Sequence, residues 1–413
     1  MTTTAVAQPL YLPDAGAAER EAEFLDRIRD VIPVVREGAA EAAQLRKLPQ
    51  ATINAIRATG MYRLHTPLEY GGLQLGLNAH VQAARLLAQG DLSTAWASSF
   101  LTLGTLRVSK RSKALQDRIF GEQPDIFSCG TNQAREGAAI EPRGDKYVVR
   151  GRWSFVSGVQ NARYVEVTLP YARNEQGQEQ RIAAMVPTDQ VKIIDVWHMS
   201  GMQATGSQDI ELDDVVIDPE FVTAYELRNE SVNPGTELHP DHPILRYSSH
   251  HVVFALHSAY VLGAAQRAVE YFREQIAPRR KRPWGTGDLI DSPVVQRNFG
   301  HAKFLVDTSE VLLNDQVNRV VDMYARGEEP DWDTRAYFNT TAVGIIRQSA
   351  EAVQMVARMS GGSMHRSVNE LDRTQRDIEV LMNHSSGDWD FHAESSGRVL
   401  LGLGLGTRPD TFF

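Results

Sequence analysis

Cysteine is almost absent from this chain of 413 residues, and long hydrophobic runs are missing as well. The single Cys129 cannot form a disulfide within the chain or a thiolate metal cage, which favours a reducing compartment. No apolar run approaches the roughly 20 residues that span a bilayer. The N-terminal sequence also lacks the basic start and apolar run of a secretory signal. We therefore expect a soluble cytoplasmic protein without a membrane partner.

Several nucleotide-binding and catalytic motifs are also missing. No G-x-G-x-x-G follows a strand-like segment, and the GLGLG at 402–406 has the wrong spacing for a nicotinamide site. Walker loop, H-E-x-x-H and G-x-S-x-G motifs do not occur. His239 and His242 flank Pro-Asp in a polar stretch typical of a solvated turn, and zinc needs three or four ligands, so we expect no metal site. The net charge of −9 argues against a nucleic-acid partner.

The sequence divides into three zones that differ in the spacing of their apolar residues. Residues 17–120 carry apolar side chains at helical spacing. From about 125 to 220, short β-branched and aromatic runs alternate with turn residues, which is typical of a small antiparallel barrel or sandwich. Helical texture returns near 245 with VVFALHSAYVLGAAQRAVEYF, which is apolar nearly all round and predicts a buried helix.

These zones predict an α+β protein. We expect an N-terminal helical domain at 1–122, a central β-barrel or sandwich domain at 123–225, and a C-terminal four-helix bundle at 226–413. Residues 228–243 have the composition of an exposed connection.

Four segments resemble, in order, signatures of the acyl-CoA dehydrogenase superfamily. They are HTPLEYGGLQLG (65–76), GDKYVVRGRWSFVSG (144–158), WHMSGMQATGSQDIELDDVVIDPEFV (197–222) and SGGSMHRSVNELDRTQRDIEV (360–380). The resemblance covers nearly the whole chain and implies an acyl-CoA dehydrogenase-like fold.

One position distinguishes the branches of that superfamily. Removing a proton beside a thioester needs a carboxylate base, and many members carry it as a Glu nine residues after the Arg of an Arg-Asp pair. Counting from Arg376 leads here to Ser385, which follows His384. A His at this place resembles the two-component flavin monooxygenases, such as hydroxyphenylacetate-type hydroxylases and the dibenzothiophene monooxygenase. GRWSFVSG and RPWGTG also resemble that group.

The resemblance implies a reduced-flavin-dependent monooxygenase that hydroxylates an aromatic or heteroaromatic small molecule through a flavin C4a-hydroperoxide. Its cofactors would be FMNH2 or FADH2 and molecular oxygen. Because no nicotinamide motif is present, a separate NAD(P)H:flavin reductase would supply the reduced flavin, and the resemblance suggests a homotetramer. Three alternatives remain open: an N- or S-oxygenating enzyme, an acyl-CoA dehydrogenase-type flavoenzyme, and a scaffold without activity.

The resemblance also implies roles for particular residues. His384 would be the base that takes the substrate proton, because an imidazole titrates near neutral pH. Ser157 would hydrogen-bond the N5 edge of the flavin. Trp153, Phe155 and Ser157 are spaced two apart, so on a regular strand their side chains face one way, here towards the flavin ring.

Further contacts are expected on other segments. The other positions expected at the cofactor are Ser128, Thr131, Ser207, Arg279, Arg282, Gly361 and Gly362, with Arg280 as a further phosphate candidate. The expected substrate contacts are Trp96, Phe100 and Tyr247. Many members carry a His after the Trp of this helix, whereas this chain reads WASSFLTLGTL, so the substrate contacts made there in relatives do not carry over.

Overall fold

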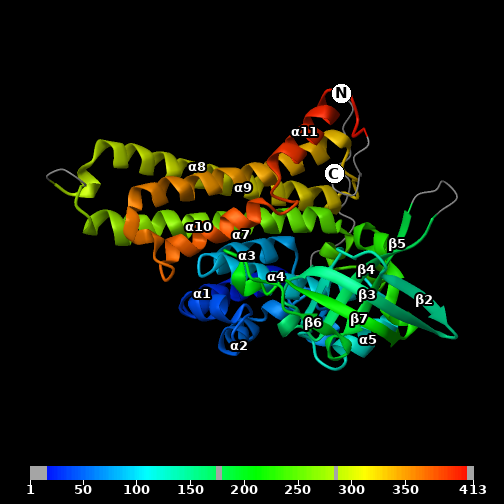
Figure 1. The fold of residues 1–413 in the computed structure, drawn as a ribbon. Coiled ribbons are helices and arrows are strands. Elements are labelled where there is room, and N and C mark those ends of the chain that lie inside the picture. The colour runs from blue at the N-terminus through cyan, green and yellow to red at the C-terminus, as the bar shows by residue number, and fades with distance from the viewer. Residues whose placement is uncertain (1–15, 174–178, 283–286, 407–413) are drawn as a thin grey trace, which may run out of the picture.

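The structure is a computed structural model that describes residues 16–173, 179–282 and 287–406. Figure 1 shows three parts: N-terminal helices in blue, a β region in green, and a long helical bundle that lies across both. The order of helices, strands and bundle confirms the predicted α+β class. The boundaries at 122 and 225 stay predictions.

From residue 16 onward, where the structure describes the chain, the N-terminal part has five α-helices. They are α1 (Ala17–Leu45), α2 (Gln50–Thr59), α3 (Leu77–Ala88), α4 (Leu92–Ser109) and α5 (Lys113–Phe120). Helix α4 is buried almost all round, and its start is fixed by Asp91, whose side chain accepts a hydrogen bond from Thr94 N–H at 2.8 Å. This buried helix carries two of the expected substrate residues, Trp96 and Phe100.

The β region consists of two four-stranded sheets, with strand orders β1-β4-β5-β8 and β2-β3-β7-β6. The strands are β1 (Ser128–Thr131), β2 (Ala139–Arg143), β3 (Lys146–Val156), β4 (Tyr164–Arg173), β5 (Glu179–Pro187), β6 (Lys192–Ile194), β7 (Gln208–Ile217) and β8 (Val222–Ala224). All strand pairs are antiparallel except β1 with β4, which is parallel and departs from the expected antiparallel pattern.

A bulge in β3 overturns the prediction that Trp153, Phe155 and Ser157 face one way. The pairing with β7 shifts between Trp153 and Val156, and Phe155 has a left-handed backbone with φ of 59°. Trp153 is therefore fully buried in the core of the β region, where its Nε1–H donates to the Thr168 carbonyl at 3.1 Å. The side chain of Phe155 turns outward and is 60% exposed.

The C-terminal part is helical, as predicted, and in the described residues three long helices and two shorter ones pack together. Its helices are α7 (Ser249–Tyr271), α8 (Pro293–Ala325), α9 (Trp332–Ser360), α10 (Glu370–Met382) and α11 (Trp389–Leu400). The stretch Ser249–Arg279 is long and apolar enough to cross a membrane, but 83% of the apolar window is buried inside the protein. Gly263 permits the close approach of α7 to α3, because a Cβ there would lie 2.0 Å from the Arg85 carbonyl oxygen.

The Arg-Asp motif of α10 joins the three parts. Asp377 accepts a hydrogen bond from Met202 N–H of the β region at 2.5 Å. One turn earlier, Arg373 Nε donates to Asp91 at 3.2 Å, the same residue that caps α4. This clamp fixes the end of α10 against α4 and the β region, and so positions the turn that follows α10.

The segment 228–243 is only in part the exposed connection that its composition predicts, because Glu230, Glu237 and Asp241 are exposed but its two histidines are not. It contains helix α6 (Pro234–Leu238), and His239 and His242 are buried, with 6% and 1% of their surface exposed. The ring of His239 is within 2.8 Å of Gln116 Oε1, and His242 packs beside His65. His239 is thus held against helix α5, while much of the segment remains exposed.

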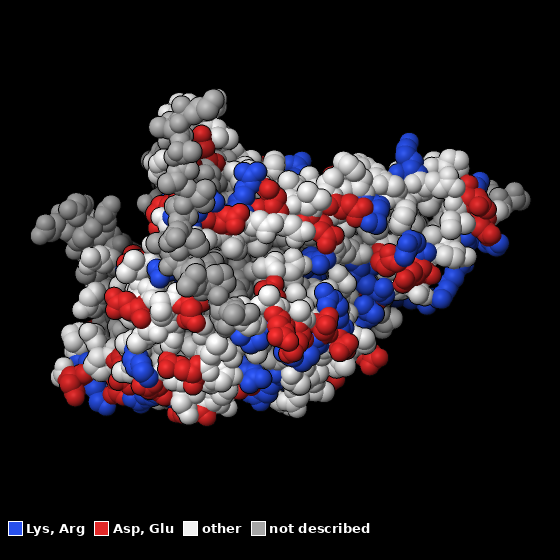
Figure 2. Space-filling model, turned by 180° about the vertical axis from the view of Figure 1, so that it is seen from behind, with Lys and Arg blue, Asp and Glu red and all other residues white. Residues whose placement is uncertain are grey.

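Lysines and arginines are interspersed with aspartates and glutamates on the face seen in Figure 2.

Candidate functional site

Four segments that are distant in the sequence meet at one cluster of polar and aromatic side chains. Helix α4 contributes Trp96, α7 contributes His257, the end of β3 contributes Ser157, and the turn between α10 and α11 contributes His384. We call this group, with Phe100, Ser207 and Ser386, the central cluster.

Hydroxyl groups in the central cluster form a directed chain of hydrogen bonds. Trp96 Nε1–H donates to Ser157 Oγ at 3.2 Å, and Ser157 Oγ lies 2.7 Å from Ser207 Oγ. Ser207 Oγ lies 2.7 Å from Thr205 Oγ1, which donates its own proton to the Met202 carbonyl at 2.8 Å. Because Thr205 uses its proton on that carbonyl, Ser207 donates to Thr205 and Ser157 donates to Ser207. Ser157 is left with a free lone pair and no free proton.

Aromatic rings wall the cluster and exclude water from it. Trp96 stacks on Phe100 with ring centroids 4.8 Å apart, and on His257 at 4.5 Å. His384 meets Trp96 edge to face at 5.3 Å. Trp96, His257 and Ser386 are each less than 5% exposed.

Ser386 links the two imidazoles and decides their tautomers. Ser386 N–H donates to His384 Nδ1 at 3.2 Å, which makes that nitrogen an acceptor and places the ring proton on Nε2. Ser386 Oγ lies 2.8 Å from the same nitrogen and therefore donates to it. Ser386 Oγ then accepts from His257 Nδ1–H, its second partner. The lone pair of His257 is consequently on Nε2, a buried atom without a hydrogen-bond partner in the described chain.

Burial keeps both imidazoles neutral. Desolvation lowers the pKa of the His384 imidazole to about 4, while the residue itself is exposed at the edge of the cluster. Desolvation also places the pKa of His257 well below its usual value, and the neighbouring His384 lowers it further. At neutral pH the pair can therefore accept a proton or donate a hydrogen bond, but it carries no charge.

The residues present fit a reduced flavin. The free lone pair of Ser157 can accept a hydrogen bond from a ring N–H, which reduced flavin carries at N5. The buried His257 Nε2 has no partner in the described chain, so a bound molecule can supply one. Arg280 Nη1 is buried without a hydrogen-bond partner beside Gly361, whose absent Cβ would lie 2.3 Å from it. A guanidinium donor held against a glycine suits a phosphate oxygen.

Several predicted site residues meet in the central cluster. His384, Ser157, Ser207, Trp96 and Phe100 are all members of it.

The structure places other predicted residues elsewhere. Ser128 packs against Gly104 of α4, and Thr131 donates to the Ser154 carbonyl at 2.7 Å. Tyr247 stacks on Tyr324 at 4.7 Å, away from the cluster.

The basic segment and the Gly-Gly pair form a separate group. Gly361 ends α9 with φ of 69°, and Gly362 begins the following turn. Arg280, rather than Arg279 or Arg282, contacts Gly361. Arg279 is exposed, and Arg282 Nε donates to the Asp288 carbonyl at 3.1 Å.

Sequence reasoning missed His257 and Ser386. His257 lies in an apolar helix with no motif around it. Its membership of the site becomes clear only from the stacking of its ring on that of Trp96. A polar, titratable residue in an otherwise apolar run was the signal that the sequence offered. Ser386 is two residues after His384, a spacing at which a serine reaches back to its neighbour.

Comparisons with known proteins agree with this fold. The model of the acyl-CoA dehydrogenase N-terminal domain matches residues 18–110, and that of the C-terminal domain matches residues 255–389. The chain is 26% identical to the p-hydroxyphenylacetate 3-hydroxylase oxygenase component of Acinetobacter baumannii, over 97% of this chain and 94% of that protein. It is 28% identical to a pigment production hydroxylase of a Rhodococcus species, over 92% and 97%. The structure of XiaF from a Streptomyces species, in complex with FADH2 and glycerol, superposes with a TM-score of 0.86 at 22% identity, over 95% and 98%.

Proposed function

The chain belongs to the acyl-CoA dehydrogenase family, and we propose that it acts there as the oxygenase component of a two-component flavin monooxygenase that hydroxylates an aromatic or heteroaromatic molecule. The observation that carries this proposal is the imidazole of His384 at the turn after α10, where a dehydrogenase needs a carboxylate, linked through Ser386 to His257 of α7. The names of the two hydroxylase relatives support it.

Reduced flavin and O2 supply the oxygen atom that is transferred to the substrate ring. Ser157 holds the N5 edge through its free lone pair, and the chain from Trp96 to Thr205 fixes the direction of that lone pair. The rings of Trp96 and Phe100 keep water from the reacting atoms.

The two histidines move the substrate proton in our proposal. His257 Nε2 accepts the proton of a phenol or ring N–H, which raises the electron density of the substrate ring. The proton on His257 Nδ1 then passes to Ser386 Oγ, and the hydroxyl proton of Ser386 passes to His384 Nδ1. His384 lies partly open to solvent and releases a proton there. His384 thus keeps the role of proton-handling residue, as the outer member of a relay.

Three further features complete the proposal. A separate NAD(P)H:flavin reductase supplies the reduced flavin, in keeping with the name "oxygenase component" of a relative. The flavin is FMNH2 or FADH2, and the enzyme is cytoplasmic. The domains are 1–122, 123–225 and 226–413.

A homotetramer with shared cofactor sites is also proposed. His257 lies in the first half of a continuous helical stretch that ends next to Arg280, so about 34 Å along the helix axis separate the central cluster from the candidate phosphate site. This separation exceeds the reach of one flavin mononucleotide, and Arg280 would therefore serve the flavin of a neighbouring subunit. Exposed apolar residues on α8, Val294, Phe304 and Val311, suit burial between subunits.

The test is a single-turnover reaction of the full chain. Reduced flavin is bound anaerobically and mixed with O2 and a panel of phenols and indoles, and products are identified by mass spectrometry. A hydroxylated product supports the proposal. Reduction of bound oxidised flavin by an acyl-CoA, without hydroxylation of any panel member, contradicts it.

A further inference from the structure

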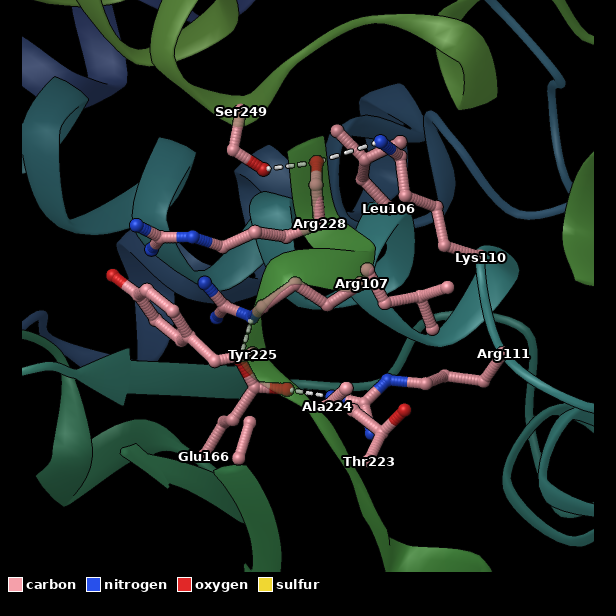
Figure 3. Close-up of a pocket in the computed structure, with 12 residues that line it drawn as sticks. Leu106, Arg107, Lys110, Arg111, Glu166, Thr223, Ala224, Tyr225, Arg228 and Ser249 are labelled. Atoms are coloured by element: carbon pink, nitrogen blue, oxygen red, sulfur yellow. Dashed lines mark hydrogen bonds and ion pairs between the residues drawn. The ribbon is translucent and has the colours of Figure 1, made fainter. Parts of the chain in front are cut away.

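A second polar site lies at the ends of α4 and α7 that point away from the central cluster (Figure 3). It is a small recess that opens to solvent. Its lining residues are Leu106, Arg107, Lys110, Arg111, Glu166, Ala183, Thr223, Ala224, Tyr225, Leu227, Arg228 and Ser249. We call it the cationic pocket.

Positive charge is in excess in the cationic pocket. Four cationic side chains, those of Arg107, Lys110, Arg111 and Arg228, line it together with one carboxylate, that of Glu166. Glu166 hydrogen-bonds to Arg111 and pairs with Arg107 at 3.7 Å, so it is already committed to two arginines. Charges of one sign that are removed from water repel one another and lose hydration, and an anionic partner offsets both costs.

Two guanidinium nitrogens in the pocket have no hydrogen-bond acceptor within the described chain. Arg111 Nη1 and Arg228 Nε are buried and make no hydrogen bond. Arg228 lies with its guanidinium 3.6 Å above the centre of the Tyr225 ring, a contact that holds the side chain in place but satisfies none of its N–H groups. Figure 3 shows Arg107, Arg111 and Arg228 arranged around the recess with Tyr225 on one side. Unpaired, buried guanidinium donors of this kind indicate a ligand with anionic oxygens.

Local structure explains part of this charge but not all of it. Arg107, Lys110 and Arg111 are at the C-terminal end of α4, where the helix dipole favours cations. Lys110 also donates to the carbonyls of Arg228 and Tyr247, both at 2.8 Å. Arg228, however, belongs to a different segment, and the first turn of α7 at Ser249 adds the positive end of a second helix dipole to the pocket.

The same two helices connect the cationic pocket to the central cluster. Trp96, Phe100 and Arg107 share one face of α4, and Trp96 and Arg107 are about 16 Å apart along the axis. On α7, Ser249 and His257 are about 12 Å apart. One elongated molecule is therefore long enough to reach both places.

We propose that the cationic pocket binds the carboxylate or phosphate group of the substrate, so that the enzyme selects aromatic molecules with an anionic tail that spans about 12–16 Å from the reacting ring. This inference rests on the proposed function, because it takes the central cluster as the place where the ring reacts. Arg228 is the specificity-determining residue, since its guanidinium is free of ion pairs within the described chain.

The experiment compares matched anionic and neutral ligands. The full chain with reduced flavin is titrated anaerobically by calorimetry with 4-hydroxyphenyl-alkanoates from the acetate to the octanoate. Primary amides of the same lengths are the neutral arm, and alkyl phosphates of the same phenols separate phosphate from carboxylate as the natural group. Arg228→Gln is the test variant, and Arg118→Gln is its control, because Arg118 also lies over an aromatic ring, Phe221, at 4.9 Å but outside the pocket.

We expect long-tailed acids or phosphates to bind wild type at least about tenfold more tightly than the amides. In Arg228→Gln the preference falls to about threefold or less, and in Arg118→Gln it is unchanged. Equal affinity of acid, phosphate and amide at every length in wild type overturns the inference, as does a preference that survives in Arg228→Gln. The wild-type comparison decides the matter even when the variant fails to fold.

The same samples separate this inference from the proposed function when they are mixed with O2. Hydroxylated product without any preference for anionic tails overturns the cationic pocket alone. A clear preference for anionic tails with no hydroxylated product overturns the proposed function alone.

Discussion

Replacing Ser386 with alanine cuts the proposed proton relay at its centre. Among the described residues, the hydroxyl of Ser386 is the one group that hydrogen-bonds to both His257 Nδ1 and His384 Nδ1. Without it, His257 Nδ1 is a buried donor without a partner, which costs about 1–3 kcal/mol of the free energy of unfolding. The protein remains folded, because Ser386 is one contact in a large core.

The effect on chemistry is expected to exceed the effect on stability. General base catalysis contributes about 100- to 10,000-fold in rate, so hydroxylation by Ser386→Ala should fall by at least about 100-fold. Flavin binding should be unchanged, because Ser157 and its hydrogen-bond chain are intact. The assay is stopped-flow mixing of the reduced flavin complex with O2 and a phenol, with product and hydrogen peroxide measured together.

The pH profile distinguishes a proton relay from a packing defect. A phenol ionises by itself near pH 10, so Ser386→Ala should recover hydroxylation as the pH approaches that value. Ser385→Ala is the matched control, because Ser385 is exposed and offers its backbone carbonyl, not its side chain, to His392. Unchanged product yield in Ser386→Ala at pH 7, or a loss that does not recover at high pH, would refute the relay.

Three other predictions follow from the same geometry. Ser157→Ala should lower the binding preference for reduced over oxidised flavin by about fivefold or more, because the serine has a lone pair but no free proton to offer N5. Equal losses of affinity for both redox forms in a fluorescence titration would contradict this. The free energy of unfolding should fall as the pH drops from about 6.5 towards 4, by up to about 1.4 kcal/mol per pH unit for each of His65 and His250. The reason is that burial lowers the pKa of both histidines to about 4, whereas the unfolded chain binds their protons near pH 6.5. Urea midpoints that stay constant between pH 7.5 and 5 would disprove this. Mixed assemblies of Arg280→Gln and His384→Ala subunits should regain activity that neither variant has alone, and no regain after verified subunit exchange would reject the shared cofactor site.

The fold was largely predictable because its pattern is local. Helical spacing and alternation of short apolar runs gave the order of helices, strands and bundle, and the apolar α7 is buried as its composition predicts. The prediction failed at the bulge near Phe155, because one extra residue reverses side-chain parity and leaves no mark in the composition. It also failed for the two histidines of 228–243, because His239 and His242 are buried against other elements instead of facing solvent.

The candidate site was predictable only where a motif marked it. Ser157, Ser207 and His384 are next to recognisable segments, and the structure brings them into one cluster. His257 and Ser386 have no such mark, since their contact joins α7 to a turn more than a hundred residues later in the chain. The cationic pocket likewise depends on Arg228 meeting the end of α4, which only the folded chain reveals.

The most direct test of the central claim is the fate of isotopically labelled dioxygen. The reduced flavin complex of the full chain is mixed with labelled O2 and the best-binding aromatic ligand, and the mass of the product is measured by mass spectrometry. The account predicts one labelled oxygen atom on the aromatic ring, and loss of that product in His384→Ala while the flavin still reoxidises. A ring that carries no label, or full labelling in His384→Ala, would contradict it.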